Sequence, residues 1–252
     1  MHENSLFFYT KKQLRDKPRV FKINKKYYLK QNNERKLHTG HRLQKLLYKI
    51  TKNPIVYPTV PSSKVNLILF ESNILEKMAK SGLNVPKVVY KTKNYYVMED
   101  TGKNFVEIIE ESNDKEKVNT LVKKALESLV ELHKKGFAKG GSQLRNFTLK
   151  DNKVYMIDFE EEIEEKYVKE LQIRDVILFL LSLEKYKVDY NLEEILDYYE
   201  KISKNVTTKT EIKKFFHSRR WIRFLNSKIF NKIRMNDVRD FLKLLEKCEH
   251  LQ

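Results

Sequence analysis

The sequence predicts an α+β fold with two lobes: a small mixed lobe of strands and helices, followed by a mainly helical lobe. Runs typical of β-strands fall mostly before residue 100, whereas helical periodicity dominates the rest of the chain. With 252 residues, of which 12% are aromatic, the chain can bury a substantial core despite its many charged residues. We expect residues 1–98 to form the first lobe, residues 99–102 a hinge, and residues 103–252 the helical lobe.

The first lobe is expected to contain two strand pairs and two helices. Short β-type runs on either side of the polar turn at residues 24–26 indicate a hairpin. Apolar residues at helical spacing predict two helices, the first ended by Asn53 and Pro54 and the second by Ser81 and Gly82. The predicted elements are strands at residues 19–23 and 27–31, helices at residues 41–52 and 67–80, and strands at residues 87–90 and 95–98.

The second lobe is expected to be mainly helical. Residues 118–132 carry apolar side chains on one face, which predicts a long amphipathic helix. Residues 175–183 are apolar on nearly all sides, as is typical of a buried central helix. The remaining predicted elements are a small hairpin at residues 147–149 and 154–157, and helices at residues 192–201, 209–226 and 237–249.

The net charge of +17 is concentrated in two segments. Residues 1–66 contain 16 Lys and Arg against 3 Asp and Glu, and residues 204–235 contain 10 against 1. Such segments indicate an anionic partner, or else they are solvated lysine-rich faces. Arginines and aromatic residues mix at residues 217–224, which would suit nucleic acid. The same residues equally predict the buried face of a helix, so nucleic-acid binding is the less favoured interpretation.

The single cysteine, Cys248, excludes a disulfide framework within the chain, and no Cys/His spacing typical of zinc sites occurs. The first residues, MHENSLFFYTKK, lack the long apolar core of a signal peptide, and no window approaches the roughly 18 apolar residues of a membrane helix. We therefore expect a cytoplasmic protein, with peripheral association at the inner face of an acidic membrane as a further expectation from the basic segments.

Two polar motifs in the second lobe predict a magnesium site. The loop AKGGSQLRNF at residues 138–147 contains Asn146, and Asp158 ends the apolar strand VYMI in the run IDFEEE. Magnesium prefers oxygen ligands, which the carboxylate and the amide carbonyl supply. Asn146 and Asp158 are therefore the candidate metal ligands.

A second candidate pair lies in the first lobe. Glu71 sits on the mostly apolar first turns of the helix predicted at residues 67–80, where an unpaired carboxylate would be costly to bury. Lys30, on the strand YYLK, is the partner that would neutralise it. Considered alone, Lys30 is more typical of a solvated strand edge, so the pairing with Glu71 is what makes it a candidate.

Taken in order, these motifs resemble those of the protein-kinase-like superfamily, in particular its bacterial branch of lipopolysaccharide-core sugar kinases and RIO-like small kinases. The resemblance runs from about residue 19 to residue 183. It rests on YYLK, the helix glutamate followed by GLNVP, the run YYVMEDTG, and the loop GGSQLRN with IDFE. It implies a two-lobed protein-kinase-like fold that uses ATP and Mg²⁺.

The same resemblance assigns roles to individual residues. It implies that Lys30 binds the nucleotide phosphates and is held by Glu71. It places Glu99 in the hinge that binds adenine through backbone groups, and it makes Asn146 and Asp158 the metal ligands. Of these, Lys30, Glu71, Asn146 and Asp158 are the implied catalytic residues, and Lys30, Glu99 and Asp158 are the implied cofactor-binding residues.

The loop at residues 138–147, which we call the catalytic-type loop, departs from the family pattern. Lys139 stands where the family has a histidine, and Gly141 stands where it has the aspartate that accepts the substrate proton. General-base help is typically worth about 10²–10⁴ in rate, so reduced or unconventional activity is expected. Lys139, or one of residues 160–162, is a candidate to reposition the acceptor or take its proton. Asp175 resembles the aspartate that braces this loop, although an acid at a helix N-terminus is equally explained by the macrodipole.

The chain also lacks a Gly-rich phosphate loop, because its first glycine is Gly40. The turn at residues 24–26 is expected to cover the phosphates with lysines and backbone groups instead. The resemblance implies an anionic acceptor for lipopolysaccharide biosynthesis, namely a sugar hydroxyl of a lipopolysaccharide or another envelope glycolipid precursor. The alternatives are a pseudokinase, because of Gly141, a Ser/Thr protein kinase and, less favoured, a basic nucleic-acid-binding protein.

Overall fold

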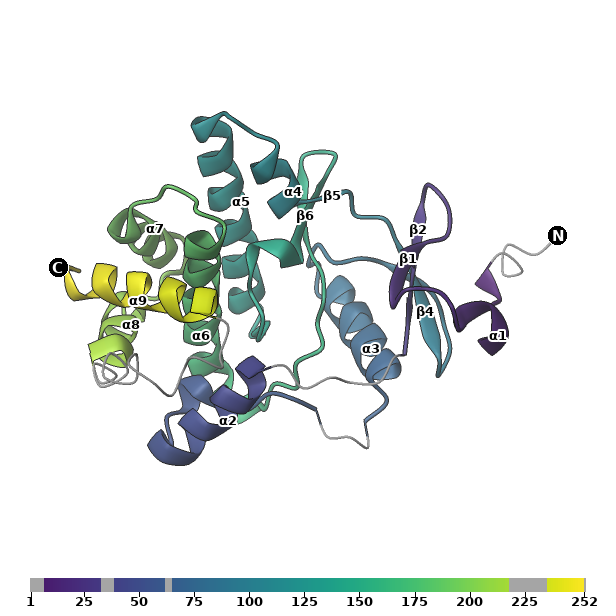
Figure 1. Cartoon of the computed structure of the whole chain (residues 1–252), viewed down its shortest axis with the longest axis horizontal. Coiled ribbons are helices and arrows are strands. Elements are labelled where there is room, and N and C mark those ends of the chain that lie inside the picture. The colour runs from purple at the N-terminus through teal and green to yellow at the C-terminus, as the bar shows by residue number, and fades with distance from the viewer. Residues whose placement is uncertain (1–6, 33–38, 62–64, 218–234, 252) are drawn as a thin grey trace.

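The computed structural model describes residues 7–32, 39–61, 65–217 and 235–251, and it shows a small sheet-bearing lobe beside a mainly helical one (Figure 1). The first lobe carries a four-stranded antiparallel sheet, and the second carries a three-stranded one. The predicted α+β class and the order of the lobes are confirmed. The predicted boundaries at residues 98 and 103 stay a prediction.

The sheet of the first lobe has the strand order β1-β2-β4-β3. Because side chains alternate along a strand, Leu29 and Val97 pack into a small apolar core while their neighbours point to the opposite face. A short helix that the sequence did not predict, α1, adds Leu14 to this core. The elements are α1 (Lys11–Leu14), β1 (Val20–Lys22), β2 (Tyr27–Gln31), β3 (Val88–Lys91) and β4 (Tyr95–Glu99).

Helix α3 (Leu67–Lys80) packs against this sheet and has the bounds that its apolar spacing predicts. Asn66 begins it, since its side-chain oxygen accepts hydrogen bonds from the backbone N–H groups of Ile68 and Leu69. The helix ends at Ser81, and Gly82 follows in the left-handed conformation.

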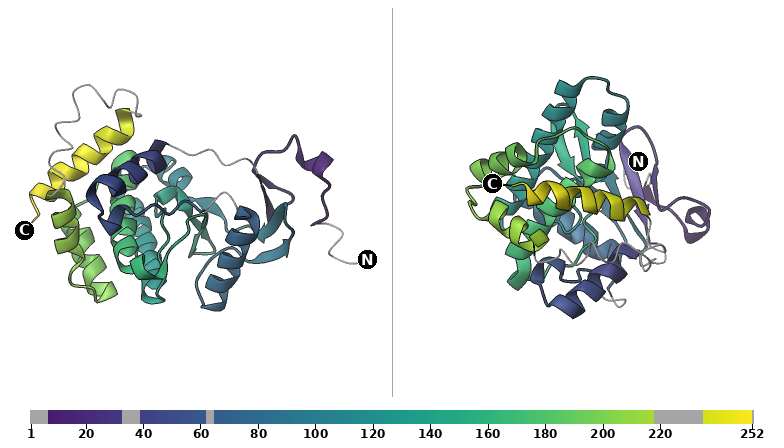
Figure 2. Two further views of the ribbon diagram at one scale, coloured as in Figure 1. Left: turned by 90° about the horizontal axis from the view of Figure 1, so that it is seen from below. Right: turned by 60° about the vertical axis from the view of Figure 1, so that its left-hand side comes forward.

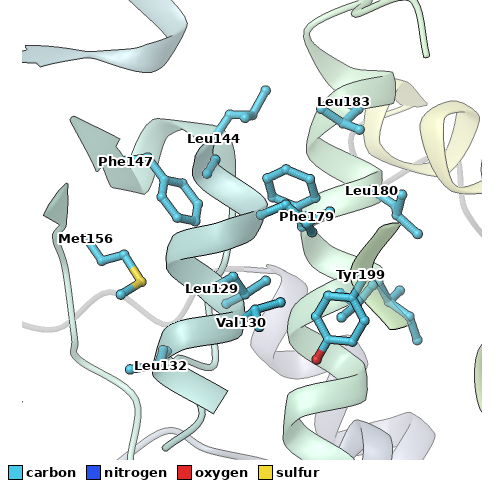
Figure 3. Packing of buried hydrophobic residues seen from close by; sticks show 14 of the residues in the cluster. Leu129, Val130, Leu132, Leu144, Phe147, Met156, Phe179, Leu180, Leu183 and Tyr199 are labelled. Atoms are coloured by element: carbon cyan, nitrogen blue, oxygen red, sulfur yellow. The ribbon is translucent and has the colours of Figure 1, made fainter. Parts of the chain in front are cut away.

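The second lobe is built around α6, which is covered by neighbours on most sides, as its apolar sequence predicts (Figure 1). Figure 3 shows Phe179 and Leu180 of this helix packed among apolar side chains from α5, the hairpin and α7. Among the described residues, no helix is both long and apolar enough to cross a bilayer. The elements are β5 (Lys103–Asn104), α4 (Phe105–Glu110), α5 (Lys115–Lys134), β6 (Phe147–Lys150), β7 (Lys153–Met156), α6 (Val168–Lys185), α7 (Leu192–Ser203), α8 (Thr208–His217) and α9 (Met235–Glu249).

Most of these elements match the predicted ones. The short elements β5 and α4 were not predicted, because two and six residues carry too little periodicity to stand out. The helix predicted at residues 209–226 is present as α8 up to His217. The basic, aromatic stretch beyond it, which carried the nucleic-acid interpretation, lies outside the described residues.

Helix α2 (Thr39–Thr51) and the segment that follows it lie against the second lobe, although both precede α3 in the chain (Figures 1 and 2). We call residues 53–61 the strap. Arg174 of α6 donates hydrogen bonds to the Tyr57 carbonyl oxygen (2.7 Å) and to the Thr59 hydroxyl (3.0 Å). The Glu162 N–H donates to the Thr59 carbonyl oxygen (2.7 Å), so the strap holds the chain that follows the DFE motif.

Gly102 is the most restricted position of the predicted hinge. Its φ is +88°, and a Cβ there would lie 2.1 Å from the carbonyl oxygen of Leu149. Gly102→Ala is expected to lower the free energy of unfolding by about 2–4 kcal/mol, because a left-handed alanine and an overpacked contact both cost energy. Denaturant unfolding measures this change.

Gly82→Ala is the matched control. Gly82 has a similar φ of +81°, but a Cβ there would meet nothing within 4 Å. It is expected to cost only about 1 kcal/mol. Equal losses in the two variants would show that the approach of Leu149 does not restrict position 102.

Candidate active site

Three predicted site residues from three different elements meet at one point. The Nζ atom of Lys30, on β2, lies 2.7 Å from an Oε atom of Glu71 on α3 and 2.9 Å from Oδ1 of Asp158, which follows β7. Lys30 and Glu71 are buried, with 4% and 1% of their surfaces exposed. The Glu71 carboxylate also accepts a hydrogen bond from the Phe159 N–H (3.1 Å), which joins α3 to the second lobe.

Two further residues complete this cluster: Glu160, which the sequence offered only as a candidate to act on the acceptor, and Arg19, which it did not single out. Oε1 of Glu160 lies 2.6 Å from Lys30 Nζ, and the guanidinium of Arg19 donates a hydrogen bond to the same oxygen. Glu160 stands two residues after Asp158, a spacing that can bring both carboxylates to one cation. Arg19 directly precedes β1, whose first residue pairs with Lys30, so the register of β1 against β2 places it beside Lys30.

The charged groups of this cluster shift one another's pKa values. Burial alone would lower the pKa of Lys30, but the carboxylates around it raise that pKa well above its ordinary value. Burial alone would raise the pKa of Asp158, but Lys30 and Lys139 hold it well below its ordinary value. In Glu71 burial dominates and raises the pKa, with Lys30 offsetting part of the effect. The cluster thus presents an ionised Asp158, with 42% of its side chain exposed, to the solvent.

The carboxylate oxygens of this cluster fit a hard cation. Atoms of Glu71, Asp158 and Glu160 lie within 4.8 Å of one another, and oxygen ligands are what Mg²⁺ prefers. The second predicted ligand, Asn146, is anchored beside them: its amide nitrogen donates to the Gly141 carbonyl oxygen (2.6 Å), which leaves its amide oxygen as a ligand atom. Its backbone oxygen accepts from the Ile157 N–H (2.9 Å), directly before Asp158.

Asp175, on α6, fixes the backbone of the catalytic-type loop through hydrogen bonds. Its carboxylate is fully buried and accepts hydrogen bonds from the N–H groups of Lys139 (2.6 Å) and Gly140 (2.8 Å). His133 of α5 lies on the same carboxylate at 3.3 Å. Burial would raise the pKa of Asp175, but these hydrogen bonds lower it below its ordinary value, so the carboxylate is ionised.

Lys139 supports the backbone around Asp158. Its Nζ atom donates to the Asp158 carbonyl oxygen (2.9 Å) and lies 4.4 Å from the centre of the Phe159 ring. The side chain is buried, with 1% of its surface exposed, and burial lowers its pKa. Whether Lys139 or one of residues 160–162 acts on the acceptor stays a prediction. In the ligand-free protein Lys139 stabilises the left-handed backbone of Asp158, at φ +66°.

The two glycines of the loop differ in the space around them. Gly140 has a φ of +81°, and a Cβ there would lie 2.6 Å from the Cβ of Glu161. Glu161 itself accepts a hydrogen bond from the hydroxyl of Thr59 on the strap. Gly141 is not in the left-handed region, and a Cβ there would meet only the amide nitrogen of Asn146, at 3.7 Å. The position of the missing acid therefore has room for a side chain.

The turn at residues 24–26 lies at the end of β2 that faces the predicted hinge. The Asp100 N–H donates to the Lys26 carbonyl oxygen (2.8 Å), and Lys22 pairs with the Asp100 carboxylate at 2.6 Å. Glu99 is exposed at the end of β4, opposite Tyr27. Lys30 lies toward the other end of β2, where Arg19 is the neighbouring cation. This corrects the expectation that the turn covers the phosphates.

Comparison with known proteins gives three results. Residues 8–195 match the family model described as the RIO domain. The chain is 28% identical over 129 residues to an uncharacterised protein of Haemophilus influenzae, which covers 50% of this chain and 53% of that protein. The chain thus spans about half the length of the curated relative that it matches. It also superposes on the gentamicin–APH(2″)-IIa complex with a TM-score of 0.41 and 12% identity, over 92% of this chain and 88% of that chain.

Proposed function

The chain belongs to the RIO domain family, which is protein-kinase-like, and from this premise we propose that it is a phosphotransferase that uses ATP and Mg²⁺ to phosphorylate an alcohol group. The observation that carries the proposal is the convergence of Lys30, Glu71 and Asp158 from three elements. Lys30 is a cation fixed by the buried carboxylate of Glu71, and it lies next to the exposed, ionised carboxylate of Asp158. Such an arrangement suits the binding of a metal-bound phosphate.

In this proposal each group has one task. Lys30 is kept protonated, fixed by Glu71, and binds negatively charged phosphate oxygens. Asp158 and Asn146 hold Mg²⁺, which when bound neutralises charge on the phosphates. Backbone groups at the end of β4, near Glu99, bind the base of the nucleotide.

The acceptor in this proposal is a sugar hydroxyl of a lipopolysaccharide or another envelope glycolipid precursor. Its support is the sequence resemblance together with the excess of basic residues in the N-terminal segment. A basic surface favours an anionic acceptor and peripheral association with an acidic membrane from the cytoplasmic side. A Ser/Thr protein kinase would use the same nucleotide site and differ only in the acceptor.

A pseudokinase is the second candidate function, and Gly141 is the observation that favours it. Without an acid at this position the chain would bind nucleotide and act as a scaffold. The loose transition state of phosphoryl transfer asks little of a base, however, and the groups for phosphate and metal are in place. We therefore favour the enzyme.

Asp158→Ala separates the two candidates. If the chain is an enzyme, this variant is expected to lower the rate of ATP turnover by about 10²–10³ or more, because it removes the charge that holds the metal. Release of labelled phosphate, or its transfer to a sugar acceptor, measures the rate. Glu165→Ala, at an exposed acid of the same segment, is the matched control and should keep the native rate. Nucleotide binding without any Asp158-dependent turnover would favour the pseudokinase.

A further inference from the structure

The carboxylate of Glu160 contacts two cations, Lys30 and Arg19. We propose that Glu160 occupies the place of a nucleotide phosphate group in the ligand-free protein, and that Arg19 is a phosphate-binding residue of this chain. The inference rests on the proposed ATP-binding function and extends it. The chain has no Gly-rich loop to bind the nucleotide phosphates, and the inference assigns part of that binding to Arg19.

The geometry around Glu160 is that of an anion site. One oxygen, Oε1, accepts from the Lys30 ammonium (2.6 Å) and from the Arg19 guanidinium. Arginine binds phosphate and carboxylate oxygens with the same planar set of donors, so one anion can replace the other. The Nε atom of Arg19 is buried and has no hydrogen-bond partner, so the guanidinium is only partly satisfied by Glu160. Its side chain is 41% exposed, which leaves it open to a ligand from solution.

The segment that carries Arg19 is held in place by a buried side chain. The amide nitrogen of Gln31 donates to three backbone carbonyl oxygens, those of Leu14 (3.0 Å), Lys17 (2.8 Å) and Pro18 (3.0 Å). The backbone N–H of Gln31 donates to the Arg19 carbonyl oxygen (2.9 Å). Since Gln31 directly follows Lys30, both cations are positioned from the same end of β2. Arg19 is thus a fixed residue of the site rather than part of a loose basic tail.

Replacement of the Glu160 carboxylate by a phosphate group would also give Glu160 a second position. Its carboxylate lies within 4.8 Å of carboxylate oxygens of Asp158 and Glu71. When a phosphate group takes its place between the cations, Glu160 is free to turn toward the metal. Until then its charge opposes the entry of a phosphate. Arg19 and Glu160 should therefore have opposite effects on nucleotide affinity, although they form one ion pair.

The test is equilibrium binding of ATP and of adenosine by calorimetry, first with a chelator and then with Mg²⁺. Arg19→Gln is expected to weaken ATP binding about tenfold, from the loss of a charge-assisted hydrogen bond, and to leave adenosine binding unchanged. Glu160→Gln is expected to tighten ATP binding in the chelator and to reduce the further gain that Mg²⁺ brings. Arg15→Gln, at an exposed arginine of the same segment, is the matched control.

The outcomes separate this inference from the function on which it rests. Wild-type protein that binds ATP, with Arg19→Gln binding it equally well, would overturn the inference alone. So would a result in which both variants lower the unfolding midpoint and leave the ratio of ATP to adenosine affinity unchanged, since a purely structural ion pair behaves in that way. Wild-type protein that binds neither ligand would overturn the proposed function as well.

Discussion

Lys30→Met is expected to destabilise the protein strongly and to abolish ATP turnover. Lys30 and Glu71 are both buried, and removing one partner leaves a carboxylate in the interior without its cation. Breaking a buried pair in this way typically costs about 3–5 kcal/mol of unfolding free energy. Denaturant unfolding measures the loss of stability, and release of labelled phosphate measures turnover.

A double variant is expected to separate the two effects. In Lys30→Met with Glu71→Gln, the buried carboxylate is gone together with its cation, and the amide oxygen can still accept from the Phe159 N–H. Asp158 and Glu160 also lose the Lys30 ammonium, but both are more exposed than Glu71. Most of the stability should return, whereas turnover should not, because the phosphate-binding cation is still missing.

Lys91→Met provides a matched comparison. Lys91 also extends from a strand of the same sheet to a glutamate of α3, Glu76, but this pair is exposed to solvent. Its loss is expected to cost at most about 1 kcal/mol. If Lys30→Met costs no more than Lys91→Met, the Lys30–Glu71 pair is not desolvated as described.

Gly141→Asp is expected to raise the rate of phosphate transfer by about tenfold or more, since a general base typically contributes about 10²–10⁴. The substitution fits the loop, because position 141 is not left-handed and a Cβ there meets only Asn146, at 3.7 Å. Initial rates at saturating ATP, with a sugar or peptide acceptor, measure the gain.

Gly141→Asn is the control for this substitution, because it adds a side chain of the same shape without a base. It is expected to leave the rate unchanged or lower it. If Gly141→Asp folds and binds ATP normally but is no faster than Gly141→Asn, a missing proton acceptor is not what limits this chain.

The sequence predicted the pairing at the centre of the site from two sources, the cost of burying Glu71 and the resemblance that singles out Lys30. A carboxylate at position 71 on an apolar helix face favours a cation as partner, and the motif YYLK offered Lys30. The parts played by Arg19 and Glu160 could not be predicted in the same way. They depend on the register of β1 against β2 and on the course of an irregular segment, neither of which leaves a periodic pattern.

The position of α2 illustrates a second limit of sequence reasoning. Its apolar spacing predicted a helix with one buried face, and that helix is present. Periodicity shows that a face is covered but not which part of the protein covers it. Chain order suggested the first lobe, whereas the strap that follows α2 is bound to α6 through Arg174.

The strap has a mechanical consequence for the two lobes. The chain passes from the first lobe to the second after β2, returns before α3, and passes over again after β4 (Figure 2). Three covalent crossings, instead of a single joint, connect the halves of the molecule. Between the first two crossings, Tyr57 and Thr59 are fixed to α6 by the hydrogen bonds of Arg174. We therefore expect the strap, as long as Arg174 binds it, to move with the second lobe in any rotation about residues 99–102.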